Sequence, residues 1–225
     1  MGVGHAALAV GSAKFAPRVN VGWLIFAALF CDFLLGIFAS LGPEHSTAPP
    51  DFAARHYLWL TFPYSHGLLG VLLWSLSAGF LVSRISKSDR KLILIVVAAL
   101  VFSHFILDAL VHVVGLPLLG DNSFKIGFGL WRNLPLELSL ETVMALLGVV
   151  IFLRAAGPNC PAIARFGIPA LIAFLTVMTW TQLSLVVPPQ PNQLIPGWIA
   201  APLVLSAAAY ALDCRRVTQT LPEAV

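Results

Sequence analysis

The chain has 225 residues, of which 59% are hydrophobic and only 10% charged, and its formal net charge is +3 at pH 7. This composition and a mean hydropathy of +0.90 exclude an ordinary soluble domain. The apolar runs match the ~20 residues that a helix needs to cross a bilayer, and they are too long for the strands of a membrane barrel. The sequence therefore predicts an all-α, polytopic membrane protein.

Six transmembrane helices are predicted in chain order, forming one bundle and one transmembrane domain over residues 1–225. Clusters of Pro and Gly separate several of them. The helices between about 21 and 154 carry polar residues, whereas those between about 166 and 212 are almost wholly apolar. The expected spans are about 21–41, 60–82, 92–114, 134–153, 166–187 and 194–212.

Lys and Arg indicate the orientation, because positively charged loops stay in the cytoplasm. The outward connections carry only Arg55, Lys125 and Arg132. Both termini are therefore predicted to be cytoplasmic, with His5 in an N-terminal tail, and the basic excess needs no nucleic-acid partner. The opposite set holds the other ten basic residues: Lys14, Arg18, Arg84, Lys87, Arg90, Lys91, Arg154, Arg165, Arg215 and Arg216.

Seven ionisable residues fall inside the first four predicted spans. Carboxylates near the bilayer centre cost about 2.5 to 3.5 kcal/mol each, so four of them cost on the order of 10 kcal/mol if uncompensated. No Lys or Arg lies in the apolar part of a span to neutralise them. The seven residues are Asp32, His66, His104, Asp108, His112, Glu137 and Glu141.

A bound metal suits this mixture of carboxylates and imidazoles. His104 and Asp108, and Asp108 and His112, are four residues apart, so each pair lies on one helix face. The candidate ligands are His66, His104, Asp108, His112 and Asp32. His104 and His112 are about 12 Å apart along the helix, which leaves open one ion with a supporting histidine or two ions. We expect zinc, with manganese or iron as alternatives.

Other roles are open for the same residues. A single intramembrane Asp or His often forms a hydrogen bond between helices, and Asp32 or Glu141 could do only that. Glu137 lies close enough to the predicted outer interface to be solvated or to pair with Arg132. His45 and His56 are interpreted as surface residues of the first outer loop.

Two segments carry a resemblance to a known family. "PYSHGLLG" in the second span and "FSHFILDALVH" in the third resemble bacterial inner-membrane proteins known as membrane-bound metal-dependent hydrolases, the YdjM-like family. The match falls on Ser65 and His66 and on Ser103, His104 and Asp108, and it extends over roughly spans one to four. The resemblance implies a multi-pass protein of the bacterial inner membrane.

The function expected on these grounds is metal-dependent hydrolysis. A metal lowers the pKa of a bound water and polarises a carbonyl or phosphoryl oxygen. Glu141 or Glu137 is the candidate general base or acid, and the substrate is expected to be a lipid or another amphiphilic ester or phosphodiester at the outer leaflet. Two alternatives remain: a non-catalytic subunit of a homo-oligomer or larger complex, docked through the last two helices, and a proton or metal-ion transporter.

Overall fold

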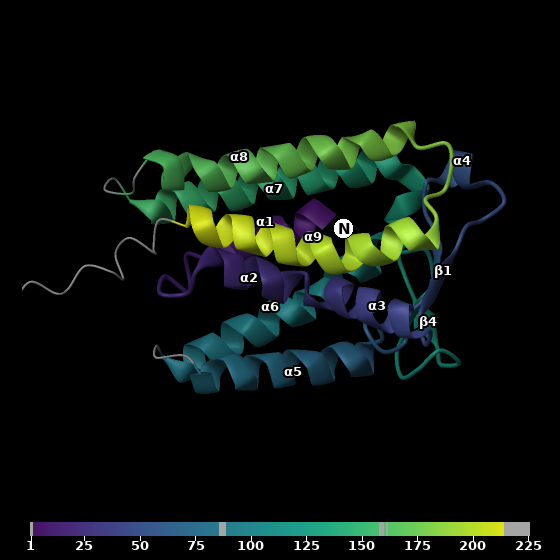
Figure 1. The fold of residues 1–225 in the computed structure, drawn as a ribbon, viewed down its shortest axis with the longest axis horizontal. Helices are drawn as coiled ribbons and strands as arrows, with labels where there is room; N and C mark the ends of the chain where they lie inside the picture. The colour runs from purple at the N-terminus through teal and green to yellow at the C-terminus, as the bar shows by residue number, and fades with distance from the viewer. Residues whose placement is uncertain (1, 86–88, 158–159, 161, 214–225) are drawn as a thin grey trace, which may run out of the picture.

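The computed structural model describes residues 2–85, 89–157, 160 and 162–213, and it is mostly helical (Figure 1). Two short antiparallel pairs, β1 (His45–Thr47) with β2 (Trp59–Thr61) and β3 (Leu116–Pro117) with β4 (Lys125–Ile126), lie at one end of the bundle. The helices are α1 (Gly2–Ser12), α2 (Val21–Ala28), α3 (Phe30–Leu41), α4 (Phe52–Arg55), α5 (Leu68–Ile85), α6 (Arg90–Val111), α7 (Leu134–Ala156), α8 (Ala162–Trp180) and α9 (Pro191–Leu212), with 3₁₀ turns at η1 (Leu130–Asn133) and η2 (Thr181–Ser184).

Among the described residues, five helices are long and apolar enough to cross a membrane: α5, α6, α7, α8 and α9. The pair α2 and α3 makes a sixth span if it is counted as one bent helix, with a bend of 53°. The prediction of a polytopic helical membrane protein is therefore confirmed, and the number of spans is five or six. The lipid bilayer is the environment that these helices require.

The bend between α2 and α3 follows from packing against α9. No proline lies at the break. A Cβ on Gly22 would collide with the backbone of Ser206, and a Cβ on Gly36 would lie 2.6 Å from a side-chain carbon of Ile199. These two glycines let both halves of the bent span approach α9 closely, so the span changes direction at Leu29 to follow it.

Helix α1 corrects one sequence prediction. His5 was expected in a cytoplasmic tail, but it is 1% exposed and α1 lies among the other helices (Figure 1). The helix packs on α7 because Gly148 has no side chain, and a Cβ there would collide with the carbonyl of Ala7. Helix α1 begins at Gly2, which lines a cavity between the helices, and runs from there towards the basic turn that holds Lys14 and Arg18.

The second predicted span also begins later than expected. Helix α5 starts at Leu68 rather than near residue 60, and the preceding residues form β2 and a tight turn. In this turn the backbone amides of Tyr64 and Ser65 donate hydrogen bonds to Glu44, each at 2.8 Å. The amides are therefore bonded to a carboxylate instead of continuing a helix, and His66 lies just before α5.

The two ends of the bundle differ as the charge pattern predicts. Helices α1, α5 and α7 end, and α2, α6 and α8 begin, at one end of the bundle, and the two β pairs lie at the other (Figure 1). Which end faces the cytoplasm remains a prediction. Lys87, Arg215 and Arg216, and with them the predicted cytoplasmic C-terminus, lie outside the described residues.

Candidate metal centre

Asp108 lies at the centre of a cluster of four histidines from three parts of the chain: α1, the turn before α5, and α6 with its C-cap. Its Oδ2 atom is 3.4 Å from His104 Nε2 and 3.5 Å from both His66 Nε2 and His112 Nε2. Its other oxygen, Oδ1, is 3.2 Å from His5 Nε2. All five side chains are buried, and the four Nε2 atoms face the carboxylate of Asp108.

Asp32 from α3 forms, with His66 and His104, a group of three ligand atoms that could hold one ion. Its Oδ1 atom is 3.7 Å from the Nε2 atoms of both His66 and His104, which are themselves 3.1 Å apart. Zinc bonds of about 2.0 to 2.1 Å place tetrahedral ligand atoms about 3.3 Å apart. The two Nε2 atoms lie 3.1 Å from each other and 3.4 to 3.7 Å from Asp32 Oδ1 and Asp108 Oδ2, and these separations scatter around that value.

Glu44 and Ser65 fix the ring of His66 from behind. Ser65 Oγ lies 2.7 Å from Glu44 Oε2 and 2.7 Å from His66 Nδ1. The hydroxyl donates to the carboxylate, so its oxygen accepts the proton of Nδ1–H. A carboxylate held behind a histidine in this way is common around metal ligands. Glu44 is 1% exposed although it lies in a connecting loop.

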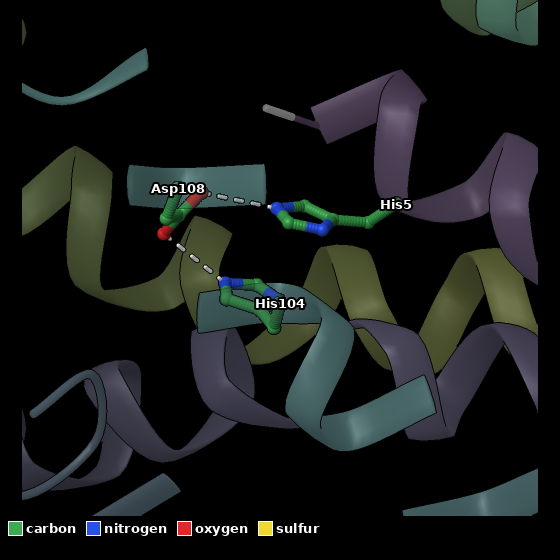
Figure 2. A group of neighbouring side chains, drawn as sticks. All are labelled: His5, His104 and Asp108. Carbon is green, nitrogen blue, oxygen red and sulfur yellow. Dashed lines mark hydrogen bonds and ion pairs between the residues drawn. The ribbon is translucent and has the colours of Figure 1, made fainter. Parts of the chain in front are cut away.

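His104 is oriented from two sides (Figure 2). Its Nδ1 donates to the carbonyl of Ala28 at 2.8 Å, the last residue of α2 before the bend. The ring of His5 stacks on it with centroids 3.8 Å apart and an interplanar angle of 4°. In Figure 2 the carboxylate of Asp108 reaches both imidazoles, one with each oxygen. The break in the first span therefore supplies the acceptor that positions this histidine.

These partners determine where the ring protons lie. A backbone carbonyl can only accept a hydrogen bond, so His104 carries its proton on Nδ1, and the Ser65 contact places the proton of His66 on Nδ1 as well. In their neutral forms both rings then direct a lone pair at each other across 3.1 Å. Two acceptors at this distance repel unless a cation lies between them, either a proton shared by the two rings or a metal ion, so the group could hold a metal.

His112 is at the edge of the cluster. It caps the C-terminal end of α6, and its ring lies 4.1 Å from that of Trp131 and 5.3 Å from that of Phe62. It meets the other ligand candidates through Asp108 Oδ2. The structure thus brings together all five predicted ligands. His112 lies at the C-terminal end of α6, beside Trp131 of η1.

Glu137 and Glu141 are buried residues of α7, and Glu137 lies near enough to Asp108 for their charges to interact. Glu141 is 1% exposed, and both of its carboxylate oxygens lack a hydrogen-bond partner of good geometry among the described residues. The backbone amides of Val3 and Gly4 are close to it. The free amides of a helix's first turn favour a carboxylate, so this position also suits a purely structural role at the start of α1.

A cavity of about 460 Å³ adjoins the cluster. Asp32, His66, Asp108 and His112 line it, and Asp32 has the most exposed side chain among them at 29%. Glu137 and Glu141 are not among its lining residues. The candidate metal position is therefore reachable from a space large enough for a small ligand.

Comparison of the chain with protein-family models, curated proteins and solved structures gives no match. The class of protein rests on the structure itself. It is a multi-span helical membrane protein with a buried His/Asp cluster that could hold a metal ion.

Two residues of the site were not identified from the sequence. His5 follows no spacing rule relative to the other ligands, and the only signal near it is the uncharged, small-residue run "GVGHAALAVGSA". Glu44 is a lone acid after a Gly-Pro turn. His45, in contrast, is exposed as expected, and His56 bonds the carbonyl of Leu185 through its Nδ1 at 2.8 Å.

Proposed function

We propose that the protein is a metal-dependent hydrolase of the bacterial inner membrane. The observation that carries the proposal is the pair of facing Nε2 atoms of His66 and His104, closed off by Asp32 and Asp108 and adjoining a cavity. A purely structural ion needs no cavity at its ligands, whereas a catalytic ion needs an open side. The resemblance to the YdjM-like family points to the same activity.

The residues have distinct roles in this proposal. His66, His104 and Asp108 hold one ion, for which zinc is the best match to the ligand set, with manganese or iron as alternatives. The ion would supply an activated water and polarise the scissile group. Asp32 is the carboxylate placed both at the cluster and at the cavity, so it is the first candidate to accept a proton from water.

Three other residues act around this centre. His112 lies on the loop side of the cavity and is a ligand for a second ion or a partner for substrate. We keep Glu141 and Glu137 as candidates for proton transfer through α1, although neither lines the cavity. The expected substrate is a lipid or another amphiphilic ester or phosphodiester at the outer leaflet.

A non-catalytic role has one specific observation in its favour. Helices α8 and α9 are the least buried of the candidate spans. Their exposed faces are free to dock a second copy or another membrane protein. In that case the cluster would fasten the helices of one subunit. This alternative predicts a bound metal without hydrolysis.

The test joins metal content to activity. We would purify the protein without chelator, measure metals by elemental analysis, and assay a panel of p-nitrophenyl acyl esters and a phosphodiester in micelles. We expect about one ion per chain and hydrolysis that a chelator abolishes and zinc restores. Stoichiometric metal with no hydrolysis would favour the docking role, and well-folded protein without metal would leave only hydrogen bonds in the cluster.

A further inference from the structure

The cavity extends from the cluster into the bilayer-facing part of the bundle. Its ionisable lining residues, Asp32, His66, Asp108 and His112, all belong to the cluster. The rest of the lining is mostly apolar and includes Leu175 and Met178 of α8 and Trp198, Ala201 and Leu205 of α9, with Gln182 of η2 as a polar side chain.

The two helices contribute one face each. On α9 the lining positions run from Gly197 to Leu205, which is about 12 Å along the axis, and on the α8 side they run from Leu175 to Gln182, about 10 Å. Thr179 does not add a free hydroxyl, because its Oγ1 donates to the carbonyl of Leu175 at 2.9 Å. The space is therefore an elongated apolar slot with its charge confined to the cluster.

The slot is open at the side of the bundle. Gly197 and Ala201 are exposed, and Met178 is 44% exposed. A Cβ added at Gly197 would meet nothing within 4 Å. Helix α9 packs mainly on α2 and α3 and touches α8 less, so the two helices are not sealed against each other. At this depth an opening between spans meets lipid rather than water.

We propose that the slot between α8 and α9 binds the acyl chain of a single-chain amphiphile whose polar group lies at the His/Asp cluster. The inference deepens the proposed hydrolase and rests on it for the role of the polar end. The chain enters sideways from the bilayer, and the small side chains of Gly197 and Ala201 leave the space that it fills. Each methylene buried there strengthens binding, so affinity should rise with chain length.

The test uses two neighbouring alanines of α9. Ala201→Leu adds bulk inside the slot, and Ala200→Leu adds the same bulk at an exposed position that does not line it. The probes are dodecanoyl hydroxamate and acetohydroxamate, which share a metal-binding head and differ in chain. Binding is followed by the visible absorption of the cobalt-substituted protein in one detergent, so that partition of the long probe into micelles is equal for all variants.

We expect the long hydroxamate to bind the wild type and Ala200→Leu about tenfold or more tighter than the short one. In Ala201→Leu this ratio falls towards one while acetohydroxamate binds as before. The proposal of an acyl-chain slot is overturned if the ratio of long-chain to short-chain affinity is unchanged in Ala201→Leu. It is also overturned if the wild type shows no preference for the long chain. Failure to bind cobalt counts against the proposed hydrolase instead.

A second readout does not depend on a metal. A diazirine-bearing dodecanoyl hydroxamate is photolysed with the protein, and the labelled peptides are mapped by mass spectrometry. Labelling of Met178 or Trp198 that unlabelled probe suppresses, and that Ala201→Leu but not Ala200→Leu lowers, supports the slot. Labelling spread evenly over exposed positions such as Val177 and Leu203 overturns it.

Discussion

At the residue scale, Asp108 links the whole cluster, because its two oxygens face four imidazoles. We expect Asp108→Ala and His104→Ala each to lower the metal content more than about tenfold, since each removes a ligand and leaves buried imidazoles without a partner. Elemental analysis of purified protein measures this loss.

The matched control for His104→Ala is His45→Ala, because His45 is a histidine of β1 that lies exposed at the end of the bundle. It should keep the metal content of the wild type. Equal metal in His45→Ala and His104→Ala would show that the bound ion is elsewhere.

Glu44 does not contact the proposed ion directly but positions its ligand His66 through Ser65. We expect Glu44→Gln to lower metal affinity about 10- to 100-fold, because the carboxylate behind Ser65 and His66 then loses its charge while the side chain keeps its size. Competition with a chelator of known affinity measures the change. Asp51→Asn, which removes an exposed carboxylate paired only with Arg55, is the control, and an equal effect of both variants would contradict the role of Glu44.

The sequence predicts part of this site for a physical reason. His104 and Asp108 are four residues apart in one helix, so the helix itself places them on one face. Glu44 approaches His66 only through the turn before α5, and His5 approaches His104 only because α1 folds into the bundle. Contacts of this kind depend on tertiary packing, and local spacing does not encode them.

At the element scale, α1 is the helix that a search of the sequence for transmembrane spans does not identify. Its 11 residues rise only about 16 Å, which is too short to cross a bilayer. The long apolar helices α5 to α9 are predicted well because their length and hydropathy are local properties. The bend at Leu29 is not predicted from the sequence, because it depends on the approach of Gly22 and Gly36 to α9.

The contact between α1 and α7 gives a direct test of this element. We expect Gly148→Val to displace α1, because even a Cβ at this position would collide with the carbonyl of Ala7. His5 would then leave Asp108 and His104, and both thermal stability and metal content should fall, the latter about 10-fold or more. Thermal unfolding in detergent and elemental analysis report the two effects.

Gly197→Ala is the control for this substitution, since a Cβ there has open space around it. It should leave stability unchanged or raise it slightly, because alanine favours a helix over glycine. Gly148→Val with wild-type stability and metal content would mean that α1 does not pack on α7 as described.

At the scale of the whole molecule, the cluster belongs to the half of the bundle on the side of the β pairs. His112 lies at the end of α6 next to Trp131, and His66 lies in the turn before α5. The basic turns gather at the opposite end (Figure 1). The positive-inside rule then predicts that the cavity at the cluster belongs to the outer half of the membrane.

Cysteine labelling tests this orientation. The side chain of Asp121 is 45% exposed and pairs with Lys125 at the surface, so Asp121→Cys places a thiol at the β end with little cost. Cys160 lies between α7 and α8 at the basic end, and Cys31 is buried. Two variants are compared. The first carries Asp121→Cys, Cys160→Ser and Cys214→Ser. The second keeps Asp121 and Cys160 and carries Cys214→Ser.

We expect a membrane-impermeant maleimide to label Asp121→Cys in intact bacterial cells and to label Cys160 only after the cells are permeabilised. The reason is energetic: ten of the thirteen basic residues belong to the connections of one side, and moving that side across the membrane opposes the charge bias of insertion. Labelling in the reverse order would turn the His/Asp cluster towards the cytoplasmic leaflet. The substrate would then have to be sought among amphiphiles of that leaflet.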